Sequence, residues 1–96
     1  MDRGSLNRAF GHELRVRREE AGLLQRDMWR GLDWAKNTYI RTESGDRGAT
    51  FEEIFAIAAF LKISPTTLFD AARTRYETGD YPMVTSADEW RDMLGL

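Results

Sequence analysis

The chain contains no cysteine, a single histidine and only two prolines among its 96 residues. Without cysteine there is no disulfide framework, no thiolate metal site and no cysteine nucleophile. The longest apolar run, Ile54 to Leu61, is far shorter than the ~20 residues that cross a membrane, and the first residues carry no apolar stretch typical of a signal peptide. We therefore expect a cytoplasmic chain with no membrane contact.

Residues that carry catalysis are also scarce. His12 is expected on the solvent side of an amphipathic helix, where it has no second histidine to form a metal site with. The adjacent carboxylates at 19–20 and 52–53 point about 100° apart on a helix, which suits solvation or capping better than shared acid–base work. No glycine-rich phosphate loop is present. The sequence therefore predicts neither an enzyme nor a metal or other cofactor site.

The charges are distributed unevenly along a chain that is long enough for one small domain. The net charge is −2, which argues against a generally basic nucleic-acid binder. Residues 1–47, however, carry ten Lys and Arg against eight Asp and Glu, whereas residues 48–96 carry four against eight. This excess of basic residues in the first half is a weak indication by itself, because a charge-rich face is usually only solvated.

Apolar spacing and capping residues predict five helices. Ser5 is a candidate N-cap and Gly22 a stop for the first helix, Asp33 a cap for the third, Thr50 with Glu53 a capping box for the fourth, and Ser64 before Pro65 a cap for the fifth. The expected ranges are 6–21, 25–32, 34–42, 51–61 and 65–76. The sequence thus predicts an all-α domain over residues 1–76.

Residues 77–96 differ in character from the preceding domain. Gly79, Asp80 and Pro82 break the helix, Tyr81 to Val84 is expected to be extended, and Ser86 to Leu94 to form a short amphipathic helix. This C-terminal extension carries more apolar side chains than twenty residues bury alone. Its candidate contact residues are Tyr81, Met83, Val84, Trp90 and Met93.

Two short helices joined by a tight turn, at 25–32 and 34–42, are typical of a helix-turn-helix. The segment from Phe10 to Phe69 resembles, without a gap, the helix-turn-helix domain shared by phage repressors, Cro proteins and bacterial XRE-type regulators. The resemblance is carried by a spaced set of residues: Leu14, Arg15, Arg18, Gly22, Gln25, Met28, Leu32, Glu43, Gly45, Phe51, Ile54, Ile57, Ala58, Leu61, Ile63, Ser64 and Leu68.

The resemblance implies roles for individual residues. Those at its base-reading positions, all expected on the outer face of the third helix, are Lys36, Asn37, Thr38 and Arg41. Those at its phosphate-contacting positions are Gln25, Ser44 and Arg47. Arg18 and Glu43 match a structural pair that ties the first helix to the end of the third. The implied partner is double-stranded DNA, bound as a pseudo-palindrome by a homodimer.

Several residues depart from the pattern of that family. Trp29 replaces a small residue, which predicts either a wider crossing of the two short helices or an indole that points outward. Leu24 replaces the usual Ser or Thr cap, a loss of roughly 1 kcal/mol. Asp33 replaces a turn glycine, a position that Asp tolerates through the left-handed conformation. Arg17 and Thr42 replace usually apolar residues.

Two functions remain open at this point. The first is a sequence-specific DNA-binding transcriptional regulator that acts as a homodimer. The alternative is an antitoxin or other interaction module that binds a partner protein through the C-terminal extension. A third arrangement, in which the extension packs on its own domain, also stays open. Binding to duplex DNA that depends on salt distinguishes the first function from a purely protein-binding role.

Overall fold

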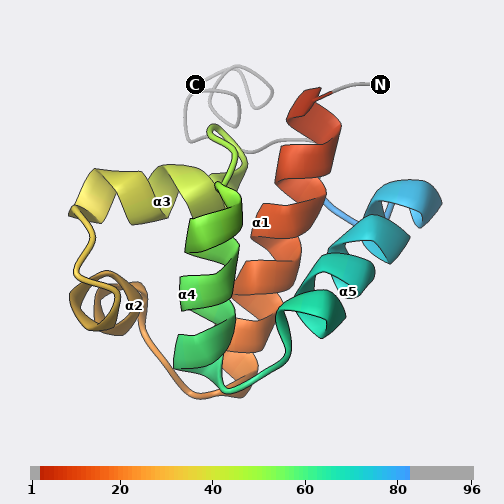
Figure 1. The fold of residues 1–96 in the computed structure, drawn as a ribbon. Helices are drawn as coiled ribbons and strands as arrows, with labels where there is room; N and C mark the ends of the chain where they lie inside the picture. Colours follow the sequence, from red (N-terminus) through yellow and green to blue (C-terminus); the bar gives the residue numbers. More distant parts are fainter. Residues whose placement is uncertain (1–2, 83–96) are drawn as a thin grey trace.

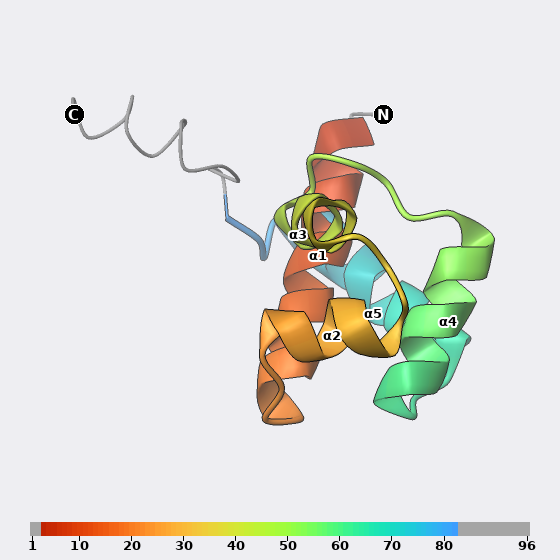
Figure 2. The same ribbon diagram turned by 90° about the vertical axis from the view of Figure 1, so that its left-hand side faces the viewer.

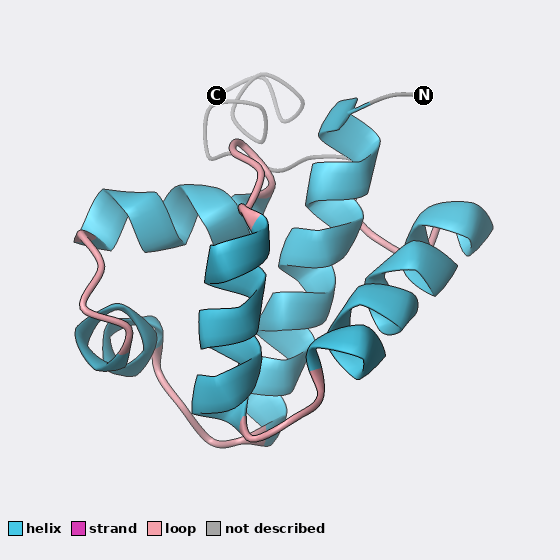
Figure 3. Cartoon of the chain, in the orientation of Figure 1, coloured by secondary structure: helices cyan, strands magenta, loops and turns pink. Residues whose placement is uncertain are grey.

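The computed structural model describes residues 3–82, which form five helices (Figure 1). In chain order these are α1 (Arg3–Glu20), α2 (Gln25–Gly31), α3 (Lys36–Ser44), α4 (Phe51–Leu61) and α5 (Pro65–Thr78). Short loops join them, and the described residues contain no strand (Figure 3). The predicted all-α architecture is confirmed. The predictions for Met83, Val84, Trp90, Met93 and the helix beginning at Ser86 lie outside the described residues.

Helix α1 runs through the middle of the domain and packs chiefly against α5 and α3. The core is formed by side chains from all five helices, and its fully buried members include Leu14, Met28, Tyr39, Ile57 and Leu68. At Gly11, an added Cβ atom would lie 2.3 Å from the carbonyl oxygen of Glu43. The backbones of α1 and the end of α3 therefore approach more closely than any side chain permits.

The starts of α4 and α5 follow the predicted capping chemistry. The Thr50 hydroxyl accepts a hydrogen bond from the Glu53 amide at 3.1 Å, and the Glu53 carboxylate accepts one from the Thr50 amide at 2.9 Å. The Ser64 hydroxyl accepts from the Thr66 amide at 3.2 Å, with Pro65 as the first residue of α5. Each cap satisfies amides that have no partner within the helix. Helix α5 runs two residues beyond the expected end, to Thr78.

Two of the expected caps are wrong. Helix α1 begins before Ser5, which therefore lies inside the helix. Helix α3 begins at Lys36, not at Trp34, and Asp33 does not cap it. Asp33 instead adopts the left-handed conformation, with φ of 59°, and the Trp34 amide donates to the Trp29 carbonyl at 2.8 Å. This hydrogen bond closes the turn and keeps the chain out of helical conformation for two further residues.

Helix α5 is fixed to α1 by an ion pair as well as by apolar contacts. Glu13, almost fully buried, accepts hydrogen bonds from Arg75 of α5 and from Arg17, both at 2.6 Å. The neighbouring His12 is half-buried, so its expected position on the solvent side is only partly right. Burial, followed by the charge of Arg75, lowers the pKa of His12 below its ordinary value of 6.5.

Helix α4 carries the apolar run seen in the sequence, and its buried residues Ile57 and Ala58 face the core. No single helix within residues 3–82 has the length and apolar character to cross a membrane. Helices α4 and α5 reach that length only when counted together, and a bend of 107° separates them.

Candidate nucleic-acid interface

Helices α2 and α3 lie together on one side of the domain (Figure 2). The four residues Leu32 to Ala35 connect them, and the Leu32 amide donates to the Met28 carbonyl at 2.9 Å. Met28, which is fully buried, anchors α2 in the core. The two short helices are thus held at a fixed angle by a tight turn with the left-handed Asp33 at its centre.

Helix α3 has a buried side and an exposed side. Tyr39, Thr42 and Glu43 are buried. On the outside, Lys36, Asn37 and Arg41 are exposed, and Thr38 is half-buried. Spacing by about 3.6 residues per turn separates the two sets, so the side chains at the predicted base-reading positions project away from the core.

The cations of the domain fall into two groups. Six described arginines have a carboxylate oxygen within 4.0 Å: Arg15, Arg17, Arg18, Arg47, Arg73 and Arg75. Within residues 6–82, six cations form no ion pair with a carboxylate: Arg8, Arg26, Arg30, Lys36, Arg41 and Lys62. Four of these six lie on α2 and α3, so unpaired positive charge is concentrated on these two helices.

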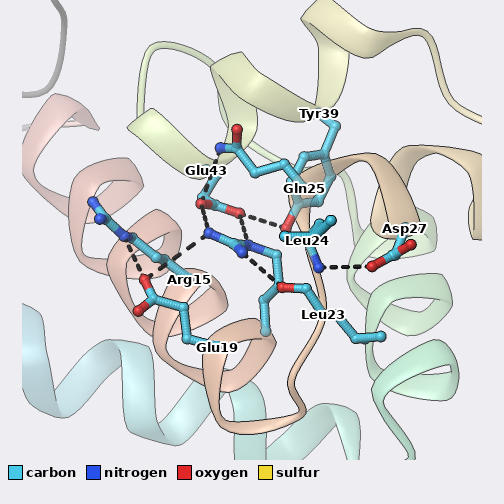
Figure 4. Close-up of polar contacts among 9 residues, drawn as sticks. Arg15, Glu19, Leu23, Leu24, Gln25, Asp27, Tyr39 and Glu43 are labelled. Carbon is cyan, nitrogen blue, oxygen red and sulfur yellow. Dashed lines mark hydrogen bonds and ion pairs between the residues drawn. The ribbon is translucent and has the colours of Figure 1, made fainter.

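A buried polar cluster joins α1, α2 and α3 (Figure 4). The Arg18 guanidinium donates to both carboxylate oxygens of Glu43 at 3.0 Å, and also to the Leu23 carbonyl at 2.8 Å. The Gln25 side-chain amide donates to Glu43 at 3.2 Å, and the Tyr39 hydroxyl donates to the same carboxylate. Glu43 thus receives hydrogen bonds from three other residues, one on each of the three helices.

The electrostatics of this cluster keep Arg18 and Tyr39 in the forms that their hydrogen bonds to Glu43 require. The hydrogen bond to Glu43 raises the pKa of Arg18 above its already high value. Burial, together with the negative charge of Glu43, raises the pKa of Tyr39 well above its usual range. Tyr39 therefore remains a neutral hydroxyl donor at any ordinary pH, and Arg18 remains a cation.

Trp29 is half-buried and packs against the core, with its ring also in contact with the start of α3. The Lys36 ammonium lies 5.8 Å from the centroid of the indole, within cation–π range. Trp34 is half-buried, and its ring centroid lies 6.2 Å from that of Tyr39. Aromatic contacts therefore connect α2, the turn and α3.

A family model described as a helix-turn-helix domain matches residues 9–71 of the chain. The chain belongs to this helix-turn-helix family. The match agrees with the segment from Phe10 to Phe69 in which the sequence showed the resemblance. No curated protein and no solved structure gives a significant match. Because a helix-turn-helix domain places its second helix in the DNA major groove, the exposed side of α3 is the candidate DNA-reading surface.

The three residues predicted at phosphates are all engaged within the helix-turn-helix domain. Gln25 donates to Glu43, as described above, and the Ser44 hydroxyl donates to the Arg41 carbonyl at 3.2 Å. Arg47 donates to the Thr42 hydroxyl at 2.7 Å and pairs with Glu53 at 3.1 Å. The hydrogen bond from Arg47 gives the hydroxyl of Thr42 a partner. Thr42 is the buried polar residue that stands at a usually apolar position of the family.

Two arginines of the helix-turn-helix, Arg26 and Arg30, are not among the predicted contact residues. Both are exposed on α2 and form no ion pair with the described residues. Their spacing of four residues could have identified them from the sequence, because it places two cations on the same surface of a helix. The role of Tyr39 as a donor to Glu43 also follows from an i, i+4 spacing on α3.

Proposed function

We propose that the chain is a sequence-specific regulator of transcription of the repressor and Cro type, which binds a pseudo-palindromic operator as a homodimer. The observation that carries this proposal is the exposed side of α3, where the side chains of Asn37 and Arg41 make no hydrogen bond with any other described residue. Polar groups held on a rigid helix and left without protein partners are free to bind base edges.

The chemistry of each side chain assigns it a type of base. Arg41 suits the O6 and N7 acceptors of guanine, and Asn37 suits the paired donor and acceptor of adenine. Lys36, at the start of α3, also suits guanine, and its position over the Trp29 indole restricts its direction. Thr38 is half-buried and reaches either a base or a phosphate.

The phosphate contacts require side chains that already have protein partners. A glutamine amide has two hydrogens to donate, so Gln25 has the capacity to keep its bond to Glu43 and to offer the second hydrogen to a phosphate oxygen. Arg47, paired with Glu53, and Ser44 lie directly after α3. The unpaired Arg26 and Arg30 add positive charge on α2, which crosses the DNA backbone in a helix-turn-helix complex.

A homodimer is part of the proposal because one small domain gains little affinity from one half-site. A two-fold dimer presents two α3 helices to successive major grooves, about 34 Å apart along the duplex. The residues first expected to make the dimer contact are Tyr81, Met83, Val84, Trp90 and Met93 of the C-terminal extension, of which Tyr81 lies within the described residues.

The test is selection of bound sequences from a pool of random duplexes, followed by affinity measurements over a range of salt concentrations. We expect a two-fold symmetric consensus and a logarithmic affinity that falls linearly with the logarithm of the salt concentration. Asn37→Ala should lose preference at one base pair per half-site. Arg15→Ala, which removes an exposed arginine of α1 paired with Glu19, serves as the control and should retain the consensus. If no sequence is enriched, the proposal is wrong.

A further inference from the structure

An apolar groove runs between α1, α4 and α5. Its volume is about 420 Å³, and most of its wall is formed by Leu6, Phe10, Phe51, Ile54, Phe69 and Ala72. Three phenylalanines on α4 and α5 are left largely in water: Phe51 is 80% exposed, Phe55 62% and Phe69 46%. Exposure of so much aromatic surface in one region of a small domain is typical of an interaction site.

The groove lies apart from the candidate DNA-reading surface. Helix α5, which forms one wall, is on the opposite side of the domain from α2 (Figure 1). Among the described residues of the wall the charged side chain is Arg73, which is 58% exposed and forms exposed ion pairs with Asp70 at 3.7 Å and Glu77 at 3.8 Å. Exposed pairs of this kind are weak, so the groove offers an apolar floor with an arginine at its edge that is able to exchange its carboxylate partner.

The C-terminal residues 83–96 have the complementary chemistry. Trp90, Met93 and Leu94 stand at the i, i+3 and i+4 spacing of an apolar helix face. Asp88, Glu89 and Asp92 against a single arginine give this segment a net negative charge. Its apolar side chains match the floor of the groove, and its charge matches Arg73.

We propose that this groove binds the C-terminal segment, residues 83–96, of a second copy of the chain. The last described residues, 79–82, lie on the side of α1 away from α4 (Figure 2). The segment that follows therefore begins on the far side of α1 from its own groove. Reciprocal exchange of two segments between two grooves produces a closed, two-fold symmetric dimer.

The surface involved is sufficient for a stable dimer. In a symmetric pair, Phe51, Phe55, Phe69 and Trp90 of both copies leave water. A fully buried aromatic side chain contributes about 150–250 Å². The three phenylalanines are already partly buried, so these side chains bring the exchange close to the roughly 1,200 Å² of total buried area found in small specific interfaces. This inference supplies the contact for the homodimer of the proposed function and rests on that part of it.

Cross-linking distinguishes exchange from binding within one chain, because the natural sequence contains no cysteine. Asn7→Cys in the groove wall is combined with Arg91→Cys beside Trp90, and the purified full chain is oxidised at several concentrations. We expect a covalent dimer. The control pairs Arg15→Cys, on an exposed part of α1 outside the groove, with Arg91→Cys, and should give little cross-linking. A covalent monomer, or the absence of any cross-link, overturns the inference.

Sedimentation equilibrium without DNA provides the second measurement. Phe51→Ser, Phe69→Ser and Trp90→Ala should each raise the dimer Kd by at least about tenfold, as expected for buried aromatic anchors. Leu24→Ser replaces an equally conspicuous exposed apolar residue outside the groove and should leave the Kd unchanged. Wild-type protein that is monomeric, or variants that dimerise as tightly as wild type, would contradict the exchange.

The two proposals fail separately. A chain that dimerises through the groove but selects no DNA sequence contradicts only the regulatory function. A chain that selects a palindromic sequence, while its Phe51→Ser variant still dimerises with the wild-type Kd, contradicts only the assignment of the groove.

Discussion

Replacing Glu43 by Gln tests whether the buried cluster holds α3 in place. The substitution keeps the size of the side chain but removes its charge, and it turns one acceptor oxygen into an amide donor that faces Arg18. The side chains of Arg18 and Glu43 are only 11% and 5% exposed. Because removing one partner leaves the other charge buried without compensation, we expect a loss of about 3–5 kcal/mol in the free energy of unfolding.

A loss of this size is large for a small domain. Each kcal/mol lowers the melting temperature of a domain of 60–100 residues by about 4–8 °C, so Glu43→Gln should melt at least ~12 °C below wild type. Tyr39→Phe removes a single hydrogen bond to the carboxylate and should cost about 1.5–3 kcal/mol. Glu19→Gln makes the same chemical change in an exposed carboxylate, which pairs with Arg15 at 2.7 Å and lies 3.9 Å from Arg18, and should melt close to the wild-type temperature.

Thermal and urea denaturation followed by circular dichroism measure these effects, and DNA affinity is measured below the melting temperature of each variant. A double-mutant cycle with Arg18→Met and Glu43→Met isolates the pair, and the double variant should be less destabilised than the sum of the two single variants. If Glu43→Gln and Glu19→Gln melted at the same temperature, the cluster would not contribute to stability and the reasoning would be refuted.

Four further results are expected. Arg41→Ala and Asn37→Ala should each weaken specific binding by about 1–3 kcal/mol and relax preference at one base pair, and equal losses on random duplexes in titrations would show that they contact only phosphate. Gln25→Ala should weaken binding to all duplexes without changing the selected consensus, and a changed consensus would contradict the phosphate assignment. Leu24→Ser restores an N-cap oxygen to α2 and should stabilise the domain by about 0.5–1 kcal/mol in urea denaturation; an unchanged midpoint would refute this. The pKa of His12 is lowered in the folded domain, so His12 binds a proton more readily in the unfolded chain, and the free energy of unfolding should rise with pH just below 6.5. His12→Gln should remove this rise. A variant with the wild-type pH profile would show that other groups cause the rise.

The parts of the fold that the sequence predicts well are those decided by neighbouring residues. Thr50 with Glu53, and Ser64 with Pro65, complete their hydrogen bonds within one turn, so their pattern is readable without knowledge of the rest of the domain. Asp33 has two local options, a helix cap and a left-handed turn residue. The choice between them depends on the Trp34 amide reaching the Trp29 carbonyl, which the residue types alone do not determine.

The candidate site shows the same division. The exposed side of α3 follows from helical spacing once the helix is located, and apolar spacing located it to within two residues at each end. The ion pair of Arg47 with Glu53 depends instead on how the loop before α4 folds back toward α3. Glu43 and Arg18 are 25 residues apart in the chain, and no local pattern relates them. Their pairing was expected only from the resemblance, whereas the bond from Tyr39 to Glu43 spans four residues within α3 and is local.

The two-sidedness of α3 has a consequence for how the specificity of such a chain changes in evolution. Tyr39, Thr42 and Glu43, which hold the helix, share none of their contacts with Asn37 and Arg41 on the outside. Mutations at the outer positions should therefore leave the domain folded. If the chain binds an operator as proposed, a duplicated copy of its gene could acquire a new operator in single steps, and a library randomised at 37 and 41 should consist largely of folded proteins from which new specificities are selected.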